Sequence, residues 1–98
     1  MAIKNLNVTI GAAATAFTAA SIRCNWFTAI DRDSSAMAIG GSDSSVGSQG
    51  KGVPLSANGS YTVQRPYNAQ INLAYWYVAG TQSQILSIVY DDGVDNLA

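Results

Sequence analysis

The chain has 98 residues, which is enough for one domain with a single core but short for an enzyme with a deep cleft. Apolar residues make up 48% of the chain and charged residues only 11%, so uncharged side chains such as Ser, Thr and Asn must cover most of its surface. The formal net charge is −1 and the basic residues are scattered, which argues against binding to nucleic acid or to an anionic membrane.

Catalytic chemistry has few possible carriers in this sequence. With no His and no Glu, acid–base work would fall on Asp, Tyr, Lys or Cys, and no nucleophile has a visible base beside it. The single cysteine, Cys24, has no second Cys or any His with which to build a disulfide or a zinc site. It lies in an alternating run, which predicts a small buried side chain. We therefore expect no enzymatic activity, no cofactor and no metal site.

Residues 1–20 allow two interpretations, a possible N-terminal arm or a first strand followed by a loop. The segment faintly resembles a signal peptide, but Asn5, Asn7 and Gly11 interrupt its apolar run, and secretion by this route is not expected. No apolar run reaches the roughly 20 residues of a membrane span. Residues 6–10 alternate strictly and predict a strand that buries Leu6, Val8 and Ile10. The Ala-rich residues 12–20 predict a loop or a short turn of helix.

The middle of the chain predicts a hairpin followed by a long loop. Residues 21–30 begin with Ile22, Cys24 and Trp26 on one face and then become apolar on both faces, as in a central strand. Residues 31–35 form a polar turn, and residues 36–40 return as the expected hairpin partner. The Gly- and Ser-rich residues 40–52 predict a long mobile loop.

Residues 52–64 carry the clearest turn signal, and we expect the other strands to be organised around them. Asn58-Gly59 suits a hairpin turn whose central residues have positive φ, and residues 60–64 alternate as a strand. Pro54 has no amide hydrogen to donate, so it is expected at a strand start or an exposed edge.

The last third of the chain predicts a second hairpin and an acidic tail. Residues 65–68 turn at Pro66, residues 70–78 read as the longest strand, and residues 85–90 are expected to run back beside it. Residues 91–98 are expected to form a solvated acidic tail, in preference to a calcium site built from Asp91, Asp92 and Asp95. Asp31 and Asp33 are a further pair of carboxylates that could bind calcium.

Six to eight short strands without a well-supported helix predict an all-β fold of one domain, residues 1–98. The expected architecture is an antiparallel β-sandwich or a jelly-roll-like barrel.

Aromatic residues near the end of the long predicted strand are the main candidates for contact with a partner. Tyr75 and Tyr77 are expected on one face, Trp76 and Val78 on the other, and a two-layer sandwich buries only one face of a strand. The other face needs a partner, which predicts a homo-oligomer whose interface includes Tyr75 and Tyr77 or else Trp76 and Val78.

Residues 36–90 resemble the pattern common in head decoration, or cement, proteins of tailed phages. The similar features are a strand ending in Ile39-Gly40, a polar Gly/Ser loop, Gly52-Val53-Pro54-Leu55 with Asn58-Gly59, and the aromatic strand leading through Ala79-Gly80-Thr81 into residues 85–89. The resemblance implies a non-enzymatic virion protein that sits on the capsid surface, often as a trimer, and binds the shell of major capsid protein. The alternatives are a carbohydrate-binding or adhesion module on the same sandwich and a small tail or baseplate component.

Overall fold

A computed structural model of the chain describes residues 2–41, 52–65 and 69–93. The predicted Gly/Ser loop and the turn at Pro66 fall largely outside the described residues, as does most of the predicted tail. In chain order the elements are β1 (Ile3–Thr9), β2 (Thr15–Ala16), β3 (Arg23–Cys24), β4 (Trp26–Asp31), β5 (Met37–Gly40), β6 (Val53–Leu55), β7 (Ser60–Gln64), β8 (Ile71–Asn72), the 3-10 turn η1 (Leu73–Tyr75), β9 (Tyr77–Ala79) and β10 (Ile85–Asp91).

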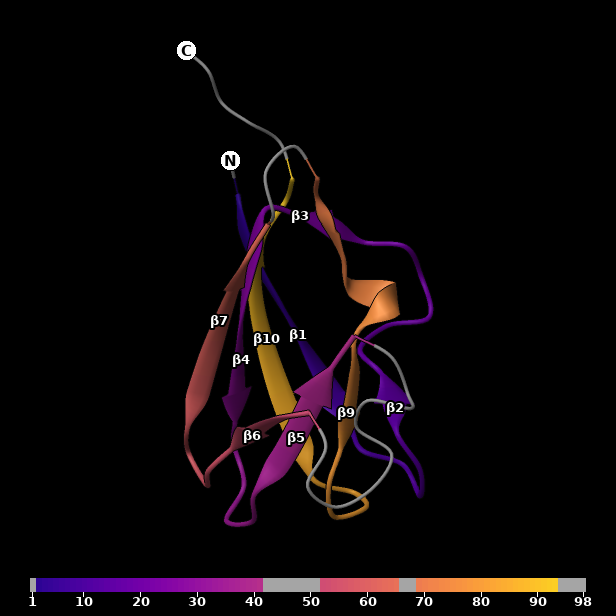
Figure 1. Cartoon of the computed structure of the whole chain (residues 1–98), viewed down its shortest axis with the longest axis vertical. Coiled ribbons are helices and arrows are strands. Elements are labelled where there is room, and N and C mark those ends of the chain that lie inside the picture. Colours follow the sequence, from indigo (N-terminus) through magenta and orange to yellow (C-terminus); the bar gives the residue numbers. More distant parts are fainter. Residues whose placement is uncertain (1, 42–51, 66–68, 94–98) are drawn as a thin grey trace.

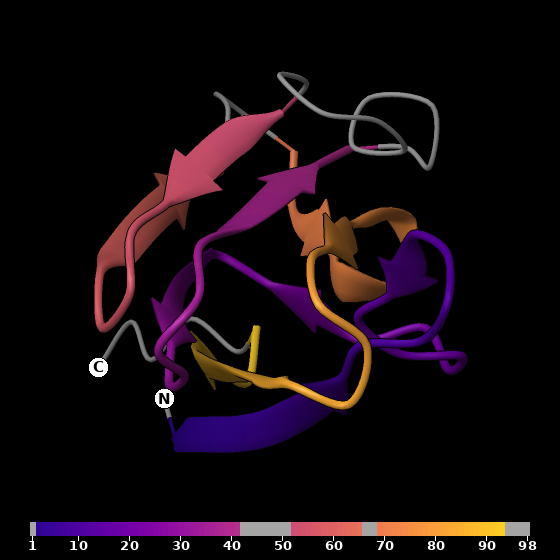
Figure 2. The ribbon, with the colours of Figure 1, turned by 90° about the horizontal axis from the view of Figure 1, so that it is seen from below.

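The strands form two four-stranded antiparallel sheets (Figure 1). Sheet A has the order β1-β10-β4-β7 and sheet B the order β2-β9-β5-β6, while β3 and β8 pair with each other beside them. The chain passes repeatedly from one sheet to the other, and this order of strands is that of a jelly roll. Figure 2 looks along the long axis and shows β1 and β5 on opposite sides of the interior. The predicted all-β antiparallel fold is confirmed.

One hydrophobic core joins the two sheets. Sheet A contributes the inward positions of β4 and β10, and sheet B contributes Ile39 and Val78, none of which is exposed. Phe17, which follows β2, meets Phe27 of β4 edge to face with ring centroids 5.7 Å apart. Trp76 meets the same Phe27 ring at 5.0 Å. Edge-to-face aromatic pairs of this kind stabilise a core beyond the area that they bury.

The strand nearest the N-terminus and the one nearest the C-terminus agree with the sequence pattern. Val8 in β1 and Ile10 directly after it are buried, as the alternation of residues 6–10 predicts, whereas Leu6 is only half-buried. The strand β10 covers the predicted last strand. Residues 2–20 do not form a separate arm, because β1 pairs with β10 along its whole length and β2 pairs with β9. The Ala-rich segment is mostly loop, as predicted, with the two-residue strand β2 within it and Phe17 buried in the core.

The predicted hairpins are wrong, because each of their turns carries the chain from one sheet to the other. The turn after β4 leads to β5 in sheet B, where β5 pairs with β6 and β9. The turn after β9 leads likewise to β10 in sheet A. Both neighbours of β4 are already β10 and β7, which leaves no place beside it for residues 36–40.

Residues 52–64 lie at the margin of the fold and are not its centre. β6 is the edge of sheet B, β7 is the edge of sheet A, and the turn between them crosses the sheets. The turn itself exists: the Gly59 amide donates to the Ser56 carbonyl at 2.8 Å. Asn58 has the positive φ of 61°, whereas Gly59 does not. Pro54 lies on the edge strand β6, as its missing amide hydrogen predicts.

The predicted long strand over residues 70–78 is interrupted, which changes its faces. The Asn72 side chain accepts a hydrogen bond from the Ala74 amide at 3.0 Å and caps η1. Asparagine side chains can bond to nearby backbone amides in place of a neighbouring strand. The alternation of polar and apolar residues does not show where this happens. After the turn, Trp76 packs against the core and Val78 lies wholly inside it, while Tyr75 is 68% exposed.

A second interruption falls at Asn25, between β3 and β4. Cys24 is buried as predicted, but the next buried residue is Phe27, so the face shared by Cys24 and Trp26 in the predicted strand does not persist. The backbone amides of Asn25 and Trp26 both donate to the carboxylate of Asp91. A buried carboxylate therefore fixes the point at which the strand changes phase.

Candidate functional site

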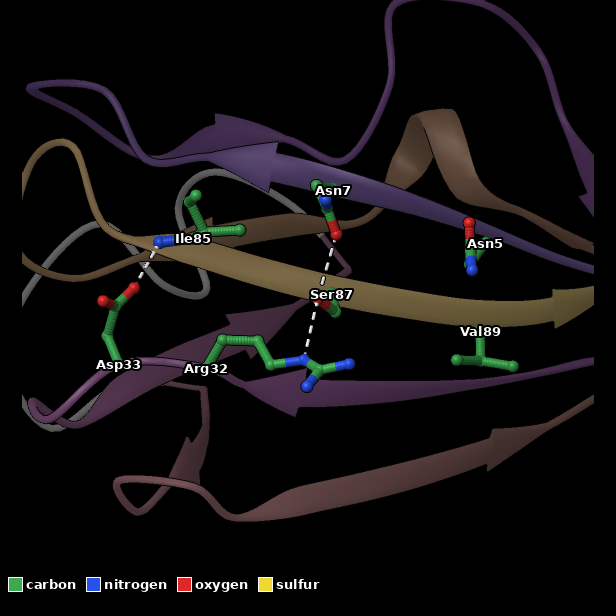
Figure 3. A pocket seen from close by; sticks show the side chains of 7 residues that line it. All are labelled: Asn5, Asn7, Arg32, Asp33, Ile85, Ser87 and Val89. Carbon is green, nitrogen blue, oxygen red and sulfur yellow. Dashed lines mark hydrogen bonds between the residues drawn. The ribbon is translucent and has the colours of Figure 1, made fainter.

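The candidate site is a groove of about 410 Å³ on the outer face of sheet A (Figure 3). The even-numbered residues of β10 from Leu86 to Tyr90 point into the core, so the alternate residues point outward. Two asparagines of β1 lie opposite them in register, and the connection after β4 closes one end. The lining residues are Asn5, Asn7, Arg32, Asp33, Ile85, Ser87 and Val89.

A chain of hydrogen bonds crosses the groove from one wall to the other. Arg32 donates through Nε to the hydroxyl of Ser87 at 3.2 Å, and Ser87 donates to Oδ1 of Asn7 at 2.9 Å. Ser87 is only 7% exposed, so the hydroxyl is held between its two partners. Among the described residues the two terminal nitrogens of Arg32 have no hydrogen-bond partner, and they extend past Ser87 in Figure 3. The guanidinium is thus positioned with donors to spare.

The carboxylate of Asp33 lies at the end of the groove that the connection after β4 closes. It accepts a hydrogen bond from the backbone amide of Ile85, which ties the connection after β4 to the start of β10 (Figure 3). Arg32 and Asp33 carry opposite charges, so the lining as a whole is neutral. Ile85 and Val89 supply apolar surface between the polar groups.

The groove offers several groups that can bind a ligand. The lining offers N–H donors from Arg32, donors and acceptors from Asn5 and carboxylate oxygens from Asp33, but no nucleophile with a base beside it. Residues 2–41, 52–65 and 69–93 contain no cluster of three His, Cys, Asp or Glu side chains that could hold a metal ion. A neutral ligand with several hydroxyl groups and one apolar face would match the groove.

A second polar centre, around Asp91, has a structural role. This residue is the last of β10, it is not exposed at all, and it does not belong to a solvated tail as predicted. Its carboxylate accepts from the Asn25 amide at 2.6 Å, the Asn25 side chain at 2.8 Å, the Trp26 amide at 3.1 Å and the Gly93 amide at 3.2 Å. A carboxylate bound by several amides stabilises the surrounding backbone.

Cys24 lies beside this centre and is an unreactive thiol. The pKa of the Cys24 thiol is raised to about 11, mainly by burial and also by the negative charge of Asp91, while a backbone hydrogen bond from Trp26 acts in the opposite direction. Because the thiolate is the reactive form, a thiol with so high a pKa is inert near neutral pH.

The residues predicted to contact partners are not brought together on one face. Val78 is buried in the core of its own chain and presents no free surface, whereas Trp76 is half-buried and packs against that core. Tyr75 on η1 is the most exposed large apolar side chain among the described residues, and Tyr77 is half-buried. Tyr75 and Tyr77 stay candidates for a contact between subunits or with a shell.

The sequence shows little that marks the groove in advance. Its asparagines and Ser87 alternate with apolar residues, as on any strand with one face in solvent. Asn7 and Ser87, which meet across the groove, are 80 residues apart in the sequence. Only the adjacent opposite charges of Arg32 and Asp33 stand out, and they read as an ordinary turn.

No helix among the described residues is long and apolar enough to cross a membrane. No protein-family model, no curated protein and no solved structure matches this chain.

Proposed function

We propose that the chain is a non-enzymatic structural protein of a virus particle, a decoration protein that binds the capsid shell as a homo-oligomer. The observation that carries the proposal is the jelly-roll order of the two four-stranded sheets, an architecture that recurs in capsid proteins. The resemblance of residues 36–90 to phage decoration proteins supports the same role and a trimeric state. The fold alone does not determine a function, so the surface must add to the case.

The surface favours association over catalysis. It has few charges to repel a neighbour, and Ile3 and Tyr75 are 59% and 68% exposed. A partner that covers these side chains would remove their apolar surface from water. The groove supplies no catalytic pair that would favour an enzyme.

The test is binding to purified heads of the virus that encodes the chain, stripped of their decoration. The protein should sediment with the heads at a fixed ratio and appear on the shell in groups of three chains by electron microscopy. Tyr75→Ser should reduce the bound amount, whereas Lys4→Ser, an exposed change on β1, should not. Failure of the wild type to sediment with heads contradicts the proposal, and density confined to the tail or baseplate would assign it to those structures.

A second candidate function, a carbohydrate-binding or adhesion module, is favoured by the groove. A neutral lining that mixes donors, acceptors and apolar side chains suits a saccharide of one or two rings, because sugar hydroxyls donate and accept. An array of neutral glycans would give specific hits that Arg32→Ala and Asn7→Ala abolish. Arg23→Ala removes an exposed arginine outside the groove and is the matched control. An array without hits removes this candidate.

A further inference from the structure

The two sheets have four edge strands, and three of them are protected against pairing with another chain. In sheet B, β2 has only two residues, and β6 has three, with Pro54 in the middle. In sheet A, β1 carries Lys4. Short strands, proline and lysine are the usual devices that prevent edge-to-edge association. The fourth edge strand, β7, has five residues without a charge or a proline.

The free edge of β7 exposes a defined set of backbone groups. Asp31 donates its amide to Gly59 at one end of the β4–β7 ladder, at 2.9 Å, and Arg65 donates to Asn25 at the other end, at 2.7 Å. Alternate residues of a strand direct their N–H and C=O groups to opposite sides. Gly59, Tyr61, Val63 and Arg65 therefore face β4. The amides and carbonyls of Ser60, Thr62 and Gln64 face away from the sheet, and no hydrogen bond within the described residues involves them.

We propose that this edge pairs with the β7 edge of a second copy of the chain, antiparallel and centred on Thr62. In this register Thr62 faces Thr62 of the other copy, and Ser60 faces Gln64 in both directions. All the outward amides and carbonyls of the strand then have partners. A shift to the next register of the same geometry would leave one residue of each copy unpaired. The two copies of sheet A would form one continuous sheet.

The side chains on both faces of β7 suit this pairing. On the outer face the hydroxyls of Thr28 and Thr62 already lie 2.8 Å apart, and the second copy would extend this pair into a row of four threonines. On the other face Tyr61, which is 43% exposed, would lie opposite Val63 of the second copy. Pairs of threonines, and pairs of an aromatic with a β-branched residue, are favourable between neighbouring strands.

The occupant is a second copy because the strand complements itself. In the register centred on Thr62, no charged residue of β7 faces a like charge of the second copy. Both copies use the same surface, so the contact forms a closed dimer. The pairing does not depend on the proposed capsid role. A chain that dimerises through β7 without binding heads, or that binds heads without this contact, would separate the two proposals.

Charge substitutions at Thr62 test the contact directly. Thr62→Lys and Thr62→Glu each place like charges opposite each other, and each should raise the dimer dissociation constant at least about tenfold. An equimolar mixture of the two variants should restore association as a mixed pair. The control is Thr9→Lys, the same change at an exposed residue of the β1 edge, which should leave the dissociation constant unchanged. Sedimentation equilibrium measures association, and far-UV circular dichroism verifies that each variant is folded.

Disulfide trapping tests the register. Opposite residues of a hydrogen-bonded antiparallel pair have Cα atoms about 5.5 Å apart, which a disulfide can span. Thr62→Cys should form a covalent dimer on mild oxidation, and the buried Cys24 should stay unreacted. Ser60→Cys is the control, because each Ser60 would lie four residues along the strand from its own counterpart, roughly 13 Å away. A monomeric wild type, no rescue in the mixture, or equal trapping at residue 60 would overturn the proposal.

Discussion

Replacing Asp91 with alanine should be among the most damaging single substitutions on this chain. Asp91 is not exposed, and its carboxylate accepts hydrogen bonds from two groups of Asn25 and from the amides of Trp26 and Gly93. Alanine removes both acceptor oxygens and with them all four hydrogen bonds. Asn25 directly precedes β4 and Trp26 is its first residue, so their amides cannot turn elsewhere without shifting this central strand of sheet A.

The magnitude follows from the donors left without a partner. Each unsatisfied buried backbone amide costs about 1–3 kcal/mol, and Asn25 and Trp26 are half-buried, which places both near the lower end of that range. With the lost bonds to the Asn25 side chain and to Gly93, the free energy of unfolding should fall by roughly 3 kcal/mol. For a domain of this size the melting temperature should drop by roughly 12–24 °C.

Urea denaturation followed by tryptophan fluorescence measures this loss, because Trp76 packs against the core and Trp26 is half-buried. The matched control is Asp92→Ala, which removes the neighbouring carboxylate, whose hydrogen bond to the Ala2 amide is exposed. The control should cost less than about 1 kcal/mol. If Asp91→Ala and Asp92→Ala are equally stable, the buried carboxylate does not organise the start of β4 and the reasoning fails.

Three further predictions concern the thiol, the turn and the exposed tyrosine. Native Cys24 should resist a thiol reagent until denaturant is added. Because its pKa is raised from 9.0 to about 11, the stabilisation from the neutral thiol is complete below pH 9 and is lost as the pH rises through 11. The urea midpoint of the wild type should therefore fall over this pH range, and that of Cys24→Ala should fall less. Gly59→Val should lower the free energy of unfolding by about 1–3 kcal/mol, because a Cβ at Gly59 would lie 3.0 Å from the Ser56 carbonyl oxygen; an unchanged melting temperature would contradict this crowding. Tyr75→Ser should weaken binding to the capsid shell by up to about 2 kcal/mol at constant melting temperature, since Tyr75 is 68% exposed; co-sedimentation with heads at an unchanged affinity would exclude it from that interface.

Strand positions could be predicted from the sequence because burial on one face leaves a local trace. The alternation around Val8 and the apolar run of β10 locate strands whose inward residues are buried, and Cys24 is buried as its neighbours indicate. The pattern fails where a side chain, and not a neighbouring strand, accepts the hydrogen bond of a backbone amide. Asn72 caps a 3-10 turn and Asp91 binds the backbone at Asn25, and each breaks the alternation of the predicted strand.

Strand pairing could not be predicted in the same way. A polar turn such as residues 31–35 serves equally well within one sheet or between two, because the local geometry of four or five residues does not depend on which sheet receives the next strand. The groove was missed for the same reason. Its walls come from β1, β10 and the connection after β4, and they adjoin only once the strand order is known.

The stretch from residue 52 to residue 64 illustrates what strand order adds. Its turn residues are the clearest in the sequence, and a well-marked turn beside an alternating strand reads as the centre of a sheet. In the structure both of its strands are edges. Pro54 is tolerated in β6 because an edge strand can lack an amide donor, and the uncharged β7 is the one edge of the described sheets with neither a protective residue nor a very short length. A strand in the centre of a sheet needs no such protection, so the absence of charge in residues 60–64 is informative only at an edge. There it leaves the outward amides and carbonyls of β7 available, and a second copy of the same strand is the simplest partner that satisfies all of them.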